Sequence, residues 1–391
     1  MNTILSSIRA RLAPAGNWVA STMEPVGKVL GMKPVKYPLR TLGVLLIYAL
    51  PILHLPLINT ENSDFSGVLF TVGTYVLVAL GLNIVIGYAG LLDLGYVGFY
   101  AVGAYTVGVI TSEHGQWPFF FALPLALVVT MISGVLLGAP TLRVRGDYLA
   151  IVTMGFGEII RIVARNTDWL GGAGGINAIP SPPDIGPEDG LFQIPHLSWQ
   201  YGYPTIDDRV TKFLHFGVLD ATPYFWMILT VIIIVICADM LIKNSRVGRA
   251  WEATREDEDV AELMGVPTFK FKLLAFAMGA CIGGLAGAMY ATRVGFINPP
   301  SFPLMLSMLF VAAVVIGGAG NRWGAILGAV IVAYLPERFR EFADWRLWVF
   351  GIALIAIVSF RTQGLFPGRA KKRVAQAEKE VQKLEEGVEV V

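Results

Sequence analysis

Charged residues are scarce in this sequence. Only 15% of its 391 residues are aspartate, glutamate, lysine or arginine, while 55% are hydrophobic. Soluble globular domains carry about 25% charged and about 45–50% apolar residues. In water, a chain this apolar would expose more hydrophobic surface than a monomer tolerates, so the excess is expected to face lipid. The composition therefore excludes a cytosolic enzyme, a secreted disulfide scaffold and a disordered regulator.

Cysteine, net charge and catalytic motifs are also sparse. The two cysteines, Cys237 and Cys281, lie inside apolar runs and indicate no disulfide framework. The net charge of +1 indicates no nucleic-acid partner. A phosphate-binding G-x-x-x-x-G-K-[ST] loop, an H-E-x-x-H zinc motif and a G-x-S-x-G nucleophile elbow are all missing from the sequence. We therefore predict no catalytic residue, no metal site and no cofactor in this chain.

Long apolar runs recur along the sequence. A helix needs about 20 mostly apolar residues to cross the hydrocarbon core of a membrane. Because two of the runs, 94–112 and 323–336, are short or interrupted by glycine, they are candidates for broken or re-entrant helices. We predict an all-α, polytopic integral membrane protein with about ten transmembrane or re-entrant helices. The ten segments are residues 40–58, 65–88, 94–112, 118–141, 147–165, 222–242, 271–292, 303–318, 323–336 and 345–361.

The distribution of lysine and arginine predicts the orientation. These residues gather in the first 39 residues, in the connection 243–272 and in the C-terminal tail, whereas the connection 166–221 is acidic. Since basic connections stay in the cytoplasm, both termini and 243–272 are predicted inside, and ten spans give the same result. The predicted parts are a cytoplasmic or interfacial leader (1–39), a membrane domain (40–366) with a periplasmic segment (166–221), and a charged cytoplasmic tail (367–391).

The most polar stretch is the cytoplasmic connection 245–267, SRVGRAWEATREDEDVAELMGVP. We read it as one helix that ends at Gly265 and Pro267, with the glycine in a left-handed cap. Two interpretations are open at this point. The stretch is either a solvated linker helix or a docking helix that presents charge to a cytoplasmic partner.

Glycine marks a second feature at residues 81–105. Six glycines in this stretch predict a bent or broken membrane helix, which is tolerated only where protein or a water-filled cavity covers its backbone. The candidate pathway or broken-helix residues are Asn83, Gly87, Gly90 and Gly95. Asp93 is interpreted as a helix N-cap, with a functional carboxylate at membrane depth as the alternative.

Two more patterns lie on predicted helices. Gly279, Gly283 and Gly287 follow i, i+4 spacing, which lets another helix approach backbone to backbone. Both packing within the chain and pairing with a second subunit fit this ladder. On the segment 147–165, Glu158, Arg161 and Arg165 form one polar stripe on an otherwise apolar helix.

Six stretches between residues 80 and 340 resemble, in order, the M-type permease subunit of bacterial ABC importers for branched-chain amino acids. Each stretch alone is a weak signal, and their common order makes the resemblance specific. They are GLNIVIGYAGLLDLGYVGFYAVGAY (81–105), RGDYLAIVTMGFGEIIRI (145–162), GGAGGI (171–176), GRAWEATREDEDVAELMGV (248–266), KLLAF (272–276) and VVIGGAGNRWGAILGA (314–329).

The resemblance implies a multi-pass subunit in a bacterial inner membrane. A sister permease subunit, two cytoplasmic ATPases that bind ATP and Mg, and a periplasmic binding protein would be its partners. The connection 248–266 would be the coupling helix that docks on an ATPase. The implied coupling residues are Arg249, Glu252, Ala253, Arg255, Glu256, Glu258 and Gly265. The alternatives are an importer of urea, short amides or other amino acids, and an ion-coupled secondary transporter.

Overall fold

The computed structural model of the protein describes most of the central part of the chain. The described residues are 33–53, 64–112, 115–143, 147–184, 193–200, 203–212, 215–217, 220–338, 348, 351–352, 355 and 364–366. The predicted leader up to residue 32, the tail 367–391 and most of the predicted span 345–361 lie outside them.

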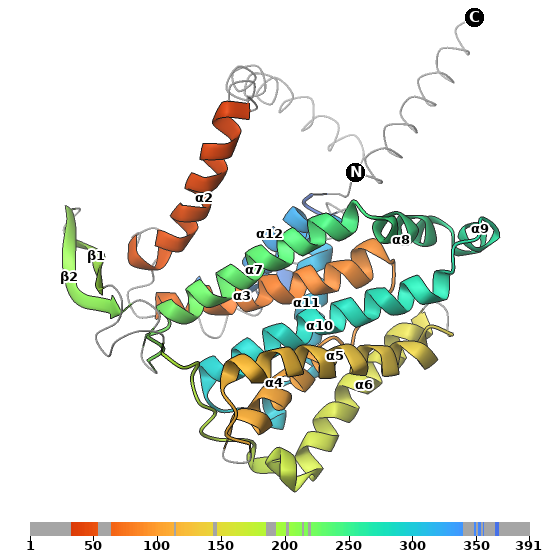
Figure 1. Cartoon of the computed structure of the whole chain (residues 1–391), viewed down its shortest axis with the longest axis horizontal. Coiled ribbons are helices and arrows are strands. Elements are labelled where there is room, and N and C mark those ends of the chain that lie inside the picture. The colour runs from red at the N-terminus through yellow and green to blue at the C-terminus, as the bar shows by residue number, and fades with distance from the viewer. Residues whose placement is uncertain are drawn as a thin grey trace, which may run out of the picture.

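Helices form most of the described chain, and several long ones run side by side (Figure 1). Three short 3-10 turns, η2 (Asp168–Leu170), η3 (Gly172–Gly174) and η4 (Pro299–Ser301), lie between them. The π-helical turn η1 (Asn83–Tyr88) directly continues α3. The helices are α2 (Lys33–Leu53), α3 (Phe65–Leu82), α4 (Val97–Thr111), α5 (Phe119–Thr141), α6 (Asp147–Asn166), α7 (Thr222–Lys243), α8 (Arg246–Glu256), α9 (Glu258–Leu263), α10 (Thr268–Val294), α11 (Leu304–Gly317) and α12 (Arg322–Arg338).

The long helices follow the predicted apolar segments. Each predicted segment from 65–88 to 323–336 coincides with a helix, and α2 begins at Lys33, before the predicted start at residue 40. The helical membrane fold is thus confirmed, whereas ten crossings and the orientation stay predictions. Among the described residues, five helices are long and apolar enough to cross a membrane: Phe65–Tyr88, Phe119–Thr141, Thr222–Lys243, Thr268–Val294 and Pro299–Gly317.

The helical body packs around α10, which contacts α4, α5 and α3, and α4 and α5 also contact each other. A β-carbon on Gly287 would lie 1.9 Å from the carbonyl oxygen of Tyr100 in α4. On Gly284 it would lie 2.2 Å from the side chain of Thr130 in α5. Because helices in lipid associate through close van der Waals packing, small residues let their backbones approach. The glycines of α10 therefore set the spacing of the central helices.

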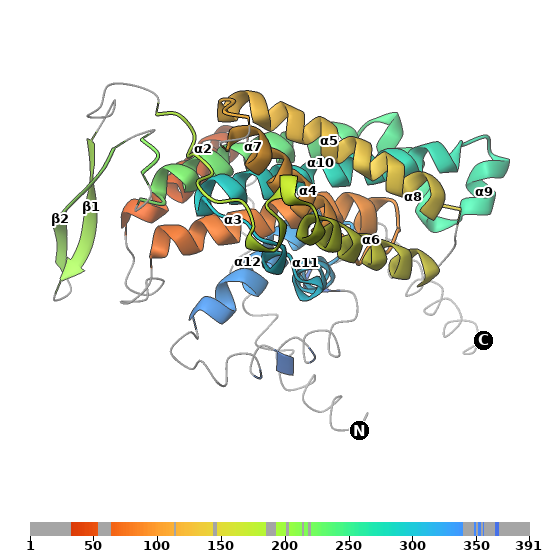
Figure 2. The same ribbon diagram turned by 90° about the horizontal axis from the view of Figure 1, so that it is seen from below.

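The connection 166–221 contains an antiparallel hairpin, β1 (Gln193–Gln200) and β2 (Tyr203–Lys212), which the all-α prediction lacks. Figures 1 and 2 place this hairpin at the opposite end of the body from α8 and α9. Earlier in the same connection, Ile176 and Ile297 exchange two backbone hydrogen bonds of 2.8 and 3.1 Å. The connection is thereby fastened to the chain just after α10.

Candidate functional site

The helix that begins as α3 is broken at its end. From Asn83 it widens into η1, and after Tyr88 the backbone is irregular up to α4, with Gly90 in the left-handed region (φ +73°). The buried Asn83 accepts, through Oδ1, a hydrogen bond from the backbone N–H of Gly320 at 2.8 Å. Three predicted broken-helix residues, Asn83, Gly87 and Gly90, therefore lie at this break. Such π-turns are frequent at functional sites.

Gly95 and Asp93 lie where the irregular segment meets α6. A β-carbon on Gly95 would fall 1.6 Å from the carbonyl oxygen of Thr153, so only glycine permits this approach. The buried carboxylate of Asp93 accepts the N–H of Gly95 at 2.9 Å. Because the N-cap of α4 is Tyr96, the interpretation of Asp93 as a helix N-cap is wrong. Its carboxylate closes a turn that precedes the helix.

The predicted helix 245–267 consists of two helices. α8 ends at Glu256, and Asp257 is extended (φ −155°, ψ 114°) before α9 begins. The side chain of Asp257 accepts the N–H of Val260 at 3.0 Å and so caps α9, which explains the break. Gly265 has φ +84° just after α9, the left-handed conformation expected of a residue that ends a helix.

Trp251 holds α8 against the body. Its fully buried indole donates a hydrogen bond to the carbonyl oxygen of Phe271 in α10 at 2.7 Å. Glu258, in α9, forms an ion pair of 2.5 Å with Lys272 of α10. The role of Trp251 was not predicted, because a tryptophan in a polar stretch does not indicate which helix it packs on. The other predicted coupling residues of α8, apart from Arg255, are exposed: Arg249, Glu252, Ala253 and Glu256.

Arg255 points away from this exposed surface toward the broken helix. Its guanidinium donates a hydrogen bond to the carbonyl oxygen of Gly87. A β-carbon on Gly320 would lie 2.8 Å from Nη1 of Arg255, and one on Gly90 would lie 2.9 Å from its Cγ. Two groups of residues that the sequence predicts separately, the coupling helix and the broken helix, therefore meet at one side chain.

A buried polar network surrounds this contact. Asp239 of α7 forms an ion pair of 3.2 Å with Arg322 of α12 and accepts a hydrogen bond from the Tyr88 hydroxyl at 3.2 Å. Lys243, one turn after Asp239, donates to the carbonyl oxygen of Gly320 at 3.1 Å. Sequence analysis missed this network, although a carboxylate inside the apolar run of α7 was a signal for it. We call the residues around the contact between Arg255 and Gly87 the coupling junction. Its members are Asn83, Gly87, Tyr88, Gly90, Asp239, Lys243, Arg255, Gly320 and Arg322.

The glycine ladder of α10 packs within the chain. A β-carbon on Gly279 would lie 2.4 Å from Val85 of η1, and one on Gly283 would lie 3.0 Å from the ring of Tyr96. The hydroxyl of Tyr96 donates to the carbonyl oxygen of Gly279 at 2.6 Å. Gly287 packs against α4, so all three glycines contact helices of the same chain. Of the two arrangements that fit their spacing, packing within the chain is therefore the one that the structure contains.

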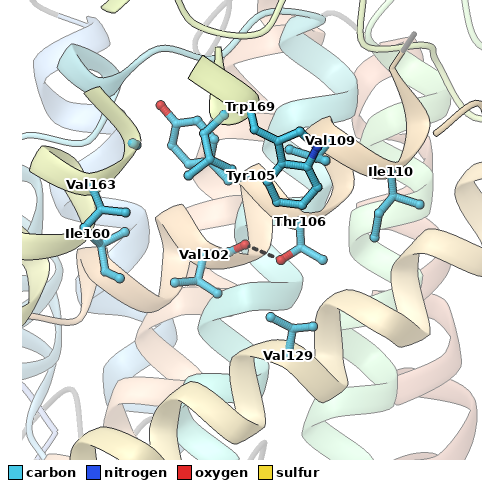
Figure 3. Close-up of a pocket in the computed structure, with 11 residues that line it drawn as sticks. Val102, Tyr105, Thr106, Val109, Ile110, Val129, Ile160, Val163 and Trp169 are labelled. Carbon is cyan, nitrogen blue, oxygen red and sulfur yellow. Dashed lines mark hydrogen bonds between the residues drawn. The ribbon is translucent and has the colours of Figure 1, made fainter. Parts of the chain in front are cut away.

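An apolar cavity of about 310 Å³ lies between α4, α5 and α6 (Figure 3). The hydroxyl of Thr106 donates to the carbonyl oxygen of Val102 at 2.7 Å and is satisfied within α4. No charged side chain of the described residues lines the cavity, so it fits an apolar group and not the charged ends of an amino acid. Its lining residues are Val102, Tyr105, Thr106, Val109, Ile110, Val129, Ile160, Val163, Ala164, Trp169 and Leu170.

Comparisons with known proteins identify relatives along most of the chain. The family described as "Branched-chain amino acid transport system / permease component" matches residues 65–358. The chain is 39% identical over 299 residues to the "High-affinity branched-chain amino acid transport system permease protein LivM" of Salmonella typhimurium. The aligned region covers 75% of this chain and 68% of the relative. A protein of the same name from Escherichia coli (strain K12) is 38% identical over 296 residues, with the same coverage. The "Probable branched-chain amino acid transport permease protein LivM" of Methanocaldococcus jannaschii is 25% identical over 350 residues, 77% of this chain and 93% of the relative. No solved structure matches the chain.

Proposed function

The chain belongs to the family of permease components of branched-chain amino acid transport systems, and from this we propose that it is one membrane subunit of an ATP-driven importer of leucine, isoleucine and valine. The complete importer contains a sister permease subunit, two cytoplasmic ATPases that bind ATP and Mg, and a periplasmic binding protein. It lies in a bacterial inner membrane, with both termini of this subunit in the cytoplasm. ATP hydrolysis takes place in the partner ATPases, and this subunit provides part of the pathway.

The surface formed by α8 and α9 supports docking of an ATPase. It lies at one end of the body, opposite the β1–β2 hairpin, which leaves the hairpin end for the binding protein (Figure 1). Beside the exposed charges of α8, α9 and the residue that follows it expose Val260, Leu263 and Met264, the last two at 87% and 80%. An apolar patch rimmed by polar residues is typical of a protein–protein contact. This surface therefore favours the docking helix over the solvated linker.

The contact between Arg255 and Gly87 is the observation that most supports this mechanism. When α8 moves with a docked ATPase, the guanidinium of Arg255 moves with α8. It thereby moves the carbonyl group of Gly87, which it binds in the broken helix. Movement at the docking surface thereby acts on a membrane element through a single hydrogen bond. The irregular backbone after η1 lacks the regular ladder of a helix and so allows two arrangements. ATP-driven closure of the ATPases selects one of them and re-aims the spans that line the pathway.

The test replaces Arg255 and Glu256 together by alanine in the importer assembled with all its partners. The junction then loses its link to α8, and the docking surface loses a charge. We expect substrate-stimulated ATP hydrolysis to fall to the basal rate, while the amount of subunit inserted in the membrane stays unchanged. Lys270→Ala, which removes an exposed charge just outside α8 and α9, is the matched control and keeps the stimulation. Normal stimulation in the double variant would reject the docking assignment.

A further inference from the structure

An ion pair on α6 has no role in the coupling junction. Nε of Arg161 donates to both carboxylate oxygens of Glu158, at 3.0 and 3.2 Å, and Nη2 donates to Oε1 as well. Glu158 lies about 16 Å along α6 from its first residue, at the rise of a regular helix. Figure 1 shows that α6 starts at the end of the body where α8 and α9 lie and slants away from it. The pair therefore lies near the middle of α6 and not at one of its ends.

The pair occupies the face of α6 that is turned away from its neighbours. On the packed face, Ile160 lines the apolar cavity against α4 and α5. On the outer face, a β-carbon at Gly155 would have nothing within 4 Å, and Ile151 and Ile162 are exposed. The side chains of Glu158 and Arg161 are 40% and 32% exposed. The result is an open face with two opposite charges between aliphatic side chains and with unoccupied space beside Gly155.

Hydrocarbon is an unsuitable environment for this face. Ionisable side chains at membrane depth face protein or a water-filled cavity, because their exposure to lipid costs free energy. α5 shows the contrast, since its exposed face bears large apolar side chains such as Phe121 and Leu136, and its sequence contains no charged residue. The outer face of α5 therefore suits lipid throughout, whereas the outer face of α6 combines exposed apolar side chains such as Ile151, Ile159 and Ile162 with a charged pair that suits water and a polar occupant.

A zwitterionic aliphatic amino acid has the chemistry that this face complements. Its carboxylate matches the two-pronged guanidinium of Arg161, and its ammonium group matches the carboxylate of Glu158. The exposed Ile151 and Ile162, with the open space at Gly155 between them, offer apolar surface to an aliphatic side chain. We propose that this face of α6 lines the translocation pathway and that Glu158 and Arg161 bind the charged head of the amino acid as it passes. The inference rests on the proposed function and names the part of the pathway that contacts the substrate.

The ion pair between Glu158 and Arg161 also suits a binding site that the substrate occupies only transiently. In the empty site each charge satisfies the other, so neither is left uncompensated. When the amino acid binds, its two charged groups replace or share the hydrogen bonds of this pair, and the net gain in free energy is small. Weak binding is required of a site along a pathway, because the occupant must leave it again.

The first test asks whether water reaches the outer face of α6 and whether bound substrate protects it. Ile162→Cys is made in a variant without Cys237 and Cys281, and the assembled importer is treated in membranes with a water-soluble maleimide. We expect the thiol to react, and leucine at about three times its dissociation constant to slow the reaction about fourfold. Leu136→Cys on α5 is the matched control and is expected to stay unreactive with or without leucine.

The second test asks whether the two charges recognise the substrate. Glu158→Gln or Arg161→Gln, added to Ile162→Cys, should leave the thiol reactive and abolish protection by leucine. Arg165→Gln removes a charge one turn further along α6 and should keep the protection. In the Ile162→Cys protein that keeps both charges, 3-methylbutylamine, which is leucine without its carboxylate, should protect less than leucine does, because it offers no group for the guanidinium of Arg161 to bind.

Three results would overturn the proposal. An unreactive thiol in Ile162→Cys would mean that lipid or the sister subunit covers this face, and a reactive thiol without protection by leucine would mean that substrate passes elsewhere. Protection that survives both Glu158→Gln and Arg161→Gln would show that the pair does not bind the substrate. The proposed function is judged separately, by leucine-stimulated ATP hydrolysis of the unmodified importer.

Discussion

At the scale of single residues, the tightest steric constraints fall on glycines that meet the backbone of another helix. Gly287 approaches the carbonyl oxygen of Tyr100, and Gly103 approaches that of Gly284, so closely that a β-carbon would lie 1.9 and 2.0 Å away. A flexible side chain can move aside, but a backbone carbonyl moves only with its helix. Any larger residue at these positions must therefore separate α4 from α10.

Gly287→Ala tests this constraint. Overpacking of a tightly packed site costs about 1–3 kcal/mol, so we expect the variant to unfold at a lower temperature in detergent than the unmodified protein. Gly155→Ala is the matched control, because a β-carbon there has open space and alanine favours the helix. Equal unfolding temperatures for the two variants, measured by thermal denaturation of the purified importer, would show that α4 and α10 are not in close contact.

Sequence analysis located many of the important residues but not their partners. The resemblance singled out Arg255, and glycine density singled out Gly87, yet 168 residues separate them and nothing local indicates their hydrogen bond. Asp239 and Arg322 likewise pair from two different helices that are far apart in the sequence. Periodicity reveals which face of a helix is buried, whereas contacts between helices depend on how the helices cross.

At the scale of elements, the apolar runs predicted the long helices because a helix is the structure that satisfies backbone groups in lipid. The break at Asp257 was not predictable in the same way. It lies in a run of acidic residues, several of which could cap a helix. The π-turn at Asn83 could not be predicted from amino-acid composition, since a π-turn differs from an α-helix only in the spacing of its hydrogen bonds.

α8 as an element depends on Trp251. Trp251→Ala removes a buried ring, a change that costs about 3–5 kcal/mol in a protein core, so we expect α8 to detach and trypsin to cleave after Arg249 and Arg255 faster than in the unmodified importer. Trp251→Phe keeps an aromatic ring and loses the hydrogen bond to Phe271, at a cost of about 1 kcal/mol. It is expected to show intermediate cleavage and to retain part of the substrate-stimulated ATP hydrolysis. Unchanged cleavage of Trp251→Ala would mean that other contacts hold α8.

At the scale of the whole molecule, charge distinguishes ATP-driven from ion-coupled transport. The described helices contain few ionisable groups at depth, and the coupling junction gathers several of them next to α8. A secondary transporter needs such groups along its ion path. The distribution of charge therefore favours a subunit whose energy arrives through a docked partner.

Energy coupling is measured by leucine uptake in cells. Depletion of ATP with the ion gradients intact is expected to stop uptake, because in the proposed mechanism closure of the partner ATPases supplies the movement at α8. Collapse of the gradients with ATP maintained should leave the initial rate of uptake nearly unchanged. Uptake that continues without ATP, driven by a proton or sodium gradient, would favour the ion-coupled carrier instead.

The continuity of α10 has a consequence for the timing of transport. This helix runs unbroken over 27 residues, about 40 Å. One end follows α9, and just beyond the other end Ile297 pairs with Ile176. A rod of about 40 Å moves its far end by about 3.5 Å for each 5° of tilt. In the proposed mechanism, opening at one side of the membrane and closing at the other would be the two ends of one rigid motion of α10, and they would then occur together without a relay between them.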